Sequence, residues 1–340
     1  MMNPRVRRVA LHAPIVLVLL AALAFQAGAL YYRYMDLPGP LPPNVGNRPG
    51  AVSLLPPKAA GAMIRFGVVG DSRGAGAFET LMDDLKREHP DFIVLPGDMS
   101  YSASDTSHML FQVEMESEIK PACPVFYIPG NHDVGPNYPL PLWESQYGPS
   151  QFFFKYGDNL FIFAYIVTQG ENADQEQKGF DFLASTLAKQ APGAKRIFVF
   201  NHVPTPGMGK FPDMGLTHGQ EVLDLLRKYH VDYFIASHYH GLAECELNGT
   251  RHIITGGGGA RLDDAARNFY HALLFEVQPD GVNMKIIRLD QTDFLAEDQF
   301  ERICRLNLWP VMAFLPPLTV LADAAIAVLL VLAVRKCVAG

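Results

Sequence analysis

The residues of this chain that could do chemistry are metal-ligand types spread along the sequence in a fixed order. Carboxylates, imidazoles and amide oxygens are the groups that hold two hard or borderline metal ions side by side. Two such ions, about 3.5–4 Å apart, form a clamp for in-line attack on phosphorus. The residues and their motifs are Asp71 in GDSR, Asp98 and Tyr101 in GDMSY, Asn131, His132 and Asp133 in GNHD, His202 in NHVP, and His238 and His240 in SHYH.

The pattern of strands and helices places these motifs along one edge of a sheet. Short apolar runs predict strands, and helical spacing of apolar residues predicts the helices between them. The strands that end directly before a motif are expected at 63–69, 92–95, 125–128, 197–200 and 233–236. Ligands of open α/β sheets bind at the carboxyl ends of strands. We therefore expect the five motifs to meet in space.

The rest of the pattern completes an α/β domain. Helices are expected at 78–88, 111–119, 175–189 and 218–229, a hairpin at 152–156 and 160–167, and further strands at 245–247, 251–255, 272–277 and 283–289. The glycine run 256–259 lacks the lysine and the following helix of a P-loop, so we interpret it as a tight strand exit. Among the other histidines, His108 is assigned to the surface or to a helix cap.

With these motifs, the chain resembles the calcineurin-like metallophosphoesterases over residues 63–289. The family pattern is an Asp block, a GD block, a GNH block, a lone His and a closing GHxH, in which Ser237 here replaces the glycine. Most members carry His two residues after the first Asp, where this chain has Arg73, and arginine cannot ligate a metal. Tyr101 stands three residues after Asp98, which is similar to the purple acid phosphatase branch.

The resemblance implies a four-layer α/β/β/α metallophosphoesterase sandwich and a dinuclear centre of iron with zinc, manganese or a second iron. The first metal would be held by Asp71, Asp98, Tyr101 and His240. The second would be held by Asp98, Asn131, His202 and His238, so that Asp98 bridges the two. The two metals would activate the oxygen nucleophile that attacks phosphorus.

Three further residues are assigned to catalysis. We expect His132 to contact the phosphate and to protonate the leaving oxygen, and Asp133 to orient His132. Because Arg73 is not a ligand, it is available to bind a phosphate oxygen in a bidentate manner.

Composition limits the partners. The 340 residues carry a formal net charge of −7, which does not suggest a broad basic surface for nucleic acid. Four dispersed cysteines are too few for a disulfide scaffold, although Cys123 and Cys245 could pair in an oxidising compartment.

Both ends of the chain read as membrane segments. Residues 13–30 are apolar apart from Gln26 and follow three arginines, which fits either an uncleaved anchor or a cleavable signal peptide. Residues 308–334 carry one charge, Asp323, and are followed by Arg335 and Lys336. The positive-inside rule then puts both termini in the cytoplasm and the domain between them on the far side, periplasmic or extracellular.

The predicted organisation is an N-terminal anchor (1–33), a linker rich in proline and glycine (34–60), a metallophosphoesterase domain (61–295) and a juxtamembrane segment with a second transmembrane helix (296–340). The predicted function is a membrane-tethered phosphoesterase acting on a phosphorylated small molecule or a lipid-linked phosphate. Alternatives are a phosphodiesterase or pyrophosphatase acting on a lipid-linked or nucleotide substrate, and a non-catalytic metal-binding receptor on the same fold.

Overall fold

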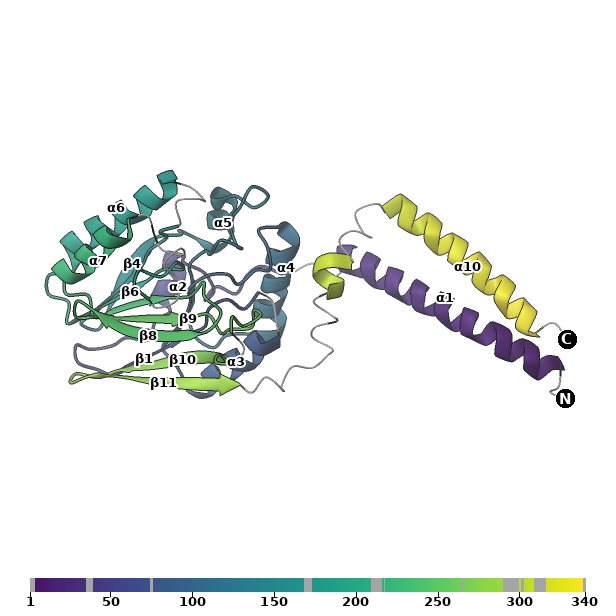
Figure 1. Cartoon of the computed structure of the whole chain (residues 1–340), viewed down its shortest axis with the longest axis horizontal. Coiled ribbons are helices and arrows are strands. Elements are labelled where there is room, and N and C mark those ends of the chain that lie inside the picture. Colours follow the sequence, from purple (N-terminus) through teal and green to yellow (C-terminus); the bar gives the residue numbers. More distant parts are fainter. Residues whose placement is uncertain are drawn as a thin grey trace. The chain divides into compact units, whose positions relative to one another are not determined.

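Two β-sheets that face each other form the larger of the two units into which the chain divides, Pro38–Gln299. The computed structural model describes residues 4–34, 39–73, 76–167, 173–208, 216, 218–264, 266–289, 300, 303–308 and 316–338. Figure 1 shows the sheets lying one over the other, with helices outside them. Each sheet mixes parallel and antiparallel neighbours, as the sequence predicts.

The first sheet has the order β11-β10-β1-β2-β3. Its strands are β1 (Ile64–Val68), β2 (Phe92–Leu95), β3 (Val125–Tyr127), β10 (Tyr270–Val277) and β11 (Val282–Leu289). Strands β1, β2 and β3 run parallel to one another, whereas β10 is antiparallel to β1. The carboxyl ends of β1, β2 and β3 therefore lie at one edge.

The second sheet has the order β4-β5-β6-β7-β9-β8. Its strands are β4 (Phe152–Tyr156), β5 (Asn159–Phe163), β6 (Arg196–Phe200), β7 (Tyr233–Ala236), β8 (Leu242–Leu247) and β9 (Thr250–Thr255). Strands β5, β6, β7 and β9 are parallel. Strands β4 and β5 form the expected hairpin, with Gly157 in the left-handed region at φ 59°.

Phe66 lies at the centre of the apolar layer between the sheets. Its ring stacks on Phe92 and Phe275, with centroids 5.2 and 4.7 Å away, and meets the rings of Phe161 and Phe198 edge-on. Such aromatic pairs add about 0.5–1.5 kcal/mol each to the burial of their area. The sequences of the central strands are continuously apolar because both faces of these strands are buried. This is typical of parallel strands that are covered on both sides.

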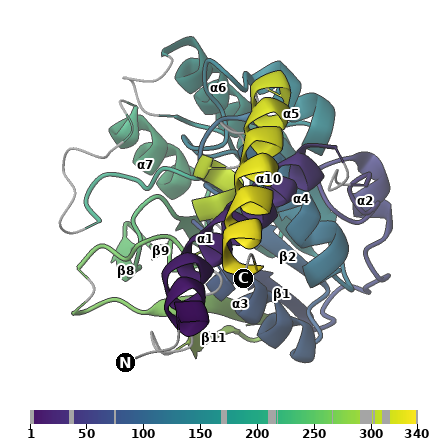
Figure 2. The ribbon, with the colours of Figure 1, turned by 90° about the vertical axis from the view of Figure 1, so that its right-hand side faces the viewer.

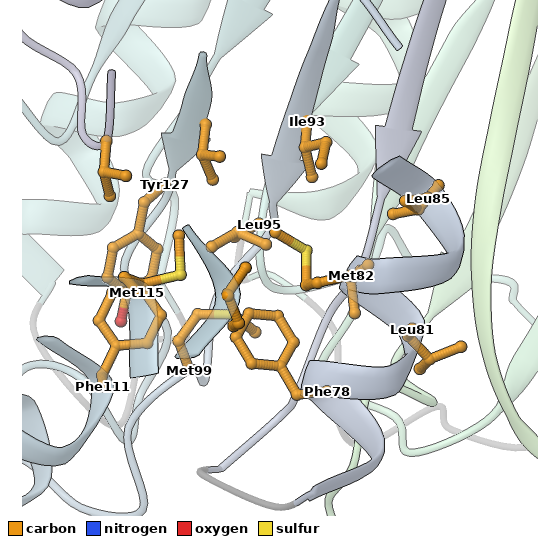
Figure 3. Close-up of a cluster of buried hydrophobic side chains, with 14 of the residues drawn as sticks. Phe78, Leu81, Met82, Leu85, Ile93, Leu95, Met99, Phe111, Met115 and Tyr127 are labelled. Carbon is orange, nitrogen blue, oxygen red and sulfur yellow. The ribbon is translucent and has the colours of Figure 1, made fainter. Parts of the chain in front are cut away.

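Helices cover the outer face of each sheet. On the first sheet lie α3 (Gly76–Arg87), α4 (Asp105–Val113), the π-helix η1 (Glu114–Ile119) and α5 (Leu140–Tyr147); on the second lie α6 (Ala173–Gln190) and α7 (Gly219–Lys228). Figure 3 shows Phe78, Met82 and Leu85 of α3 packed toward Ile93 and Leu95 of β2. Their spacing of three and four residues puts them on one face of the helix.

Several local features differ from the expectation. Helix α5 was not expected, because prolines usually interrupt helices. Here they lie at the N-cap, Pro139, and in the first turn, where proline is tolerated. The helix expected at 111–119 begins earlier, at Asp105, where Ser104 caps it by accepting from the Ser107 amide, and it continues as η1. Cys123 and Cys245 are free thiols, so the structure contains no disulfide between them.

The segment expected as a linker, 34–60, does not extend away from the domain where the structure describes it. Val45 is buried and pairs with Val125, and the buried Asn47 side chain donates to the Tyr127 and Pro149 carbonyls. A short helix, α2 (Pro49–Ser53), follows. The side chains of Asn44 and Asn47 tie this segment to the domain, because their amides donate to backbone carbonyls at 121, 123, 127 and 149.

The second unit pairs the two ends of the chain. Helix α1 (Pro4–Tyr34) and helix α10 (Pro316–Val338) run alongside each other in opposite directions, as Figures 1 and 2 show. A short π-helix, η4 (Cys304–Leu308), precedes α10. The stretches His12–Tyr31 and Leu318–Lys336 are long and apolar enough to cross a membrane, a property that a signal sequence near an N-terminus shares.

Candidate metal centre

Both sheets contribute residues to one site. Asp71, Asp98 and Asn131 follow β1, β2 and β3, whereas His202 and His238 follow β6 and β7. These five residues, together with His240, lie in two adjoining groups that share Asp98. The expectation that the motifs meet at the carboxyl ends of the strands is therefore met by the geometry.

The first group, the Asn131 cluster, consists of Asp98, Asn131, His202 and His238. The Asn131 Oδ1 atom lies 3.0 Å from both His202 Nε2 and His238 Nδ1, and those two nitrogens are 3.1 Å apart. Asp98 Oδ1 is 3.4 Å from His202 Nε2. Neighbouring ligands of one metal ion at bond lengths of about 2.0–2.2 Å are separated by comparable distances.

The tautomer of His202 shows that a cation fits this cluster. Its Nδ1 faces the Pro96 carbonyl at 3.0 Å, and a carbonyl only accepts, so Nδ1 carries the proton. The Nε2 lone pair then points at the oxygens of Asn131 and Asp98. Burial lowers the pKa of His202 to about 4, so the ring is neutral near pH 7. Lone pairs that converge in a buried place are unfavourable unless a cation lies among them.

The second group, the Asp71 cluster, consists of Asp71, Asp98 and His240. His240 Nε2 is 3.6 Å from Asp71 Oδ1, and neither buried atom has a hydrogen-bond partner. His240 Nδ1 faces the Arg261 carbonyl at 2.7 Å, which again leaves a lone pair on Nε2. Burial, followed by the nearby Asp98 carboxylate, raises the pKa of Asp71 well above its usual value. These orphaned atoms also fit a cation.

Glycines let the ligand loops approach closely. A Cβ on Gly97, which has φ 113°, would come within 2.4 Å of His202 Nδ1. A Cβ on Gly130 would come within 2.2 Å of Asp98 Oδ1. Gly97 and Gly130 therefore make room for a ligand of another loop. This is a physical reason for glycine before Asp98 and before Asn131.

The ligand loops share an uncommon backbone conformation. Asp71, Asp98 and His238 have φ values of 56°, 55° and 70°, and Arg73 has φ 49°. Each residue in the left-handed region costs roughly 1–2 kcal/mol when it is not glycine. Such strain persists only where the surroundings fix it, and it gathers at functional sites. The turn that each residue makes directs its side chain into the space between the strand ends.

Asp133 ties two of these loops together. Its buried carboxylate accepts from the backbone N–H groups of Asp98, Ser100 and Gly130, at 2.7, 2.8 and 2.7 Å, and from the Ser100 hydroxyl at 2.8 Å. Asp133 was expected to orient the His132 ring, but it does not contact that ring. Its two carboxylate oxygens are already occupied by these four donors. Asp133 thus fixes the positions of Asp98 and Asn131.

His132 lies at the mouth of the site. Its backbone N–H donates to Asp98 Oδ1 at 2.8 Å, and its ring Nδ1 faces the Tyr101 carbonyl at 2.9 Å. The Tyr101 carbonyl, rather than Asp133, therefore orients the imidazole and leaves Nε2 for other contacts. The Tyr101 side chain itself is 41% exposed, unlike the buried Asp71 and Asp98. Ligation by Tyr101 stays a prediction.

Arg73 brings a fixed positive charge to the centre. Its Nη2 donates to Asp98 Oδ2 at 3.1 Å, and its buried Nε has no partner. The guanidinium therefore offsets part of the negative charge of Asp71 and Asp98. Its partner Asp98 belongs to both clusters. The sequence did not reveal this contact.

Two positioning residues were missed or misassigned from the sequence. His108 is buried, not at the surface, and its Nε2 faces the Asp133 carbonyl at 2.8 Å while Nδ1 meets the Tyr147 hydroxyl. Ser237, noted only as a departure from a motif, places its hydroxyl 2.9 Å from His202 Nδ1 and donates to Pro96. In the sequence, the apolar neighbours of His108 on α4 were the signal that could have indicated its burial.

Comparison with known proteins identifies the family. The model of the family described as calcineurin-like phosphoesterase matches residues 64–242, which is more than half of the chain. The chain belongs to this family. The matched range contains Asp71, Asp98, Asn131, His202 and the closing histidines.

Curated relatives are more distant. The chain is 27% identical over 172 residues to the 3',5'-cyclic adenosine monophosphate phosphodiesterase CpdA of Escherichia coli, covering 48% of this chain and 60% of that protein. It is 36% identical over 56 residues to a probable cyclic nucleotide phosphodiesterase of a Pseudoalteromonas species, covering 16% of this chain and 21% of that protein. The chain thus spans less than two thirds of either relative.

Solved structures share the fold. A dimetal phosphatase from Danio rerio has a TM-score of 0.54 at 17% identity, covering 66% of this chain and 96% of that one. The purple acid phosphatase PPD1 of yellow lupin has a TM-score of 0.53 at 16% identity, covering 71% of this chain and 53% of that one. GAP50, the anchor in the inner membrane complex of Plasmodium, has a TM-score of 0.52 at 18% identity, covering 68% of this chain and 87% of that one. At these identities the likeness shows the fold alone.

The two clusters predict distinct effects on metal content. Asn131→Ala should remove one of two bound ions and His240→Ala the other, because each residue belongs to one cluster. Asp98→Ala should lower the occupancy of both, since its carboxylate is shared. Metal bound to the purified protein, measured by mass spectrometry after dialysis, checks this.

The matched control is Asp224→Ala, which removes an exposed carboxylate of α7. Its metal content should equal that of the parent, and circular dichroism should show all four variants folded. An Asp98→Ala protein that keeps both ions at full affinity would contradict the shared-carboxylate geometry.

Proposed function

We propose that this chain hydrolyses phosphate esters with two metal ions held by the Asn131 and Asp71 clusters. The supporting observation is that carboxylate and imidazole ligand atoms converge in two adjoining groups that share Asp98. The ions, when bound, would supply Lewis acidity to the phosphoryl group and to the attacking water. A purely structural cation would need neither a second cluster nor an imidazole held at its mouth.

The side chains of the protein have separate tasks in this proposal. Arg73 binds a phosphoryl oxygen through N–H groups that its contact with Asp98 does not use; a guanidinium has five such donors. His132 is the general acid. Because its Nδ1 donates to the Tyr101 carbonyl, Nε2 is the atom that carries the proton to the leaving oxygen. Asp133 acts by holding the backbone, not by touching the substrate.

The role of His132 predicts a dependence on the leaving group. His132→Gln should lower kcat by about 100- to 10,000-fold for an alkyl phosphate ester, whose alkoxide needs a proton as it leaves. The loss should be much smaller for a p-nitrophenyl ester, because p-nitrophenolate leaves without protonation. Steady-state rates for the two esters, with parent and variant, measure this difference.

Metal analysis of His132→Gln is the control, and the content should match the parent. Asp98→Asn, in contrast, should abolish turnover of both esters. Equal losses for the two leaving groups would refute the assignment of His132 as the acid and leave the phosphoesterase proposal standing. No turnover of any ester by the metal-loaded parent would remove the proposal itself.

A finer proposal concerns the metals. We infer that Tyr101 ligates iron, as in the purple acid phosphatase branch, with zinc, manganese or iron as partner. The spacing of Tyr101 after Asp98 and the replacement of the first-block histidine by Arg73 support it. The parent should then show a visible tyrosinate-to-iron band that Tyr101→Phe removes. A colourless, active protein with two zinc or manganese ions would rule this branch out.

A second candidate is the hydrolysis of a cyclic nucleotide. The two curated relatives, both described as cyclic nucleotide phosphodiesterases, favour it. It uses the same metal centre and differs only in the organic group carried by the phosphorus. Comparison of kcat/KM for cyclic AMP with kcat/KM for alkyl phosphate esters tests this candidate.

We also propose that α1 and α10 anchor the chain in a membrane, with both termini cytoplasmic and the metal domain on the far side. The antiparallel pairing of the helices supports it, as do the basic residues at their outer ends: Arg5, Arg7, Arg8, Arg335 and Lys336. In sealed cells, protease added outside the cytoplasmic membrane should cleave the domain and spare a C-terminal tag. Loss of the tag under the same conditions would exclude this topology.

A further inference from the structure

A cavity of about 500 Å³ adjoins the metal centre. Asn131, whose Oδ1 belongs to the Asn131 cluster, forms part of its wall. The rest comes from the segment 134–141, which follows the GNHD motif, from the residues after β5 and from the start of α6. Cavities of roughly 300–1,000 Å³ hold small organic ligands. Because Asn131 is common to both, the cavity lies beside the place where a phosphoryl group would meet the cations.

The wall of this cavity offers few polar groups. Its side chains include Val134, Leu140, Val167 and the three prolines 136, 139 and 141, and none is acidic, basic or histidine. Proline also lacks the backbone N–H, so this stretch of wall cannot donate from its main chain at those positions. The polar side chains of the wall are those of Asn131, Tyr165 and Gln175.

The wall is held in place from behind. Gly135 and Tyr138 exchange two backbone hydrogen bonds, at 3.0 and 3.1 Å, which closes the turn in the segment 134–141. The Tyr138 ring stacks on the buried His108, with centroids 3.7 Å apart, and His108 is bonded to the Asp133 carbonyl. The residue that ties the metal loops together thus also fixes the base of the cavity. A preformed site loses less entropy on binding.

We propose that this cavity binds an uncharged, apolar hydrocarbon group esterified to the phosphorus of the substrate. The inference rests on the proposed phosphoesterase activity and names its substrate class. A nucleobase would bury several donors and acceptors against a wall that offers few partners, and an unpaired buried polar group is disfavoured. A hydrocarbon loses no hydrogen bond there and gains from burial of its surface.

The test is a homologous series of alkyl p-nitrophenyl phosphate diesters from methyl to octyl, kept below their aggregation concentrations, with the full-length metal-loaded chain. Each methylene that enters the cavity should raise kcat/KM by up to about fourfold, until the cavity is filled. Cyclic AMP is measured in parallel. A flat series, or a kcat/KM for cyclic AMP above that of every alkyl ester, overturns the inference.

Leu140→Gln is the decisive variant, because it puts an amide into the wall. The ratio of octyl to methyl kcat/KM should fall severalfold. Leu142→Gln is the matched control: it lies two residues further along α5, is 41% exposed and is not part of the wall, so its ratio should equal that of the parent. An unchanged ratio in Leu140→Gln would overturn the inference.

If Leu140→Gln does not fold, Val134→Thr provides the same test, since it replaces one methyl group of the wall by a hydroxyl of similar size. Its ratio should also fall, and an unchanged ratio counts against the cavity. The two proposals fail in different ways. No turnover of any ester by the parent refutes the proposed hydrolysis, whereas turnover of the diesters that does not depend on chain length refutes only the hydrocarbon site.

Discussion

The carboxylate of Asp133 is the contact on which the site depends. It accepts from the backbone N–H groups of Asp98, Ser100 and Gly130, so it sets the distance between two loops that come from different strands. Without a buried acceptor there, three amides would be desolvated without partners, at about 1–3 kcal/mol each. The fold therefore uses one acidic residue to hold the two loops together, and the side chains of Asp98 and Asn131 meet in the same cluster.

Assembly of the centre works against local preferences. The ligand loops carry non-glycine residues at positive φ, and they bring Asp71 and Asp98 together in a buried place. The compensation comes from the two sheets, whose aromatic layer around Phe66 holds the strand ends in register. Strong packing behind the site thus supports both the backbone strain and the close approach of the two carboxyl groups, and a bound cation would offset the repulsion between them.

Much of this was predictable from the sequence, because strand periodicity and the rule for carboxyl ends depend only on local patterns. The strands before Asp71, Asp98 and Asn131 begin or end within a residue or two of the expected positions. What failed depended on contacts between distant segments. Nothing local distinguishes Asp133 as a tie for three amides, or shows that Asn47 would anchor a segment rich in proline against Tyr127.

Arg73 shows how one residue can join the chemistry to the charge of the site. A histidine at this position would add a neutral ligand; arginine adds a positive charge that cannot be titrated away. The guanidinium donates to Asp98, and its charge also acts on Asp71, where it opposes the effects of burial and of Asp98 on the pKa. The N–H groups of Arg73 that the contact with Asp98 does not use suit an anion. The positive charge of Arg73 therefore disfavours additional cations at the Asp71 cluster. The same charge favours a bound phosphoryl group.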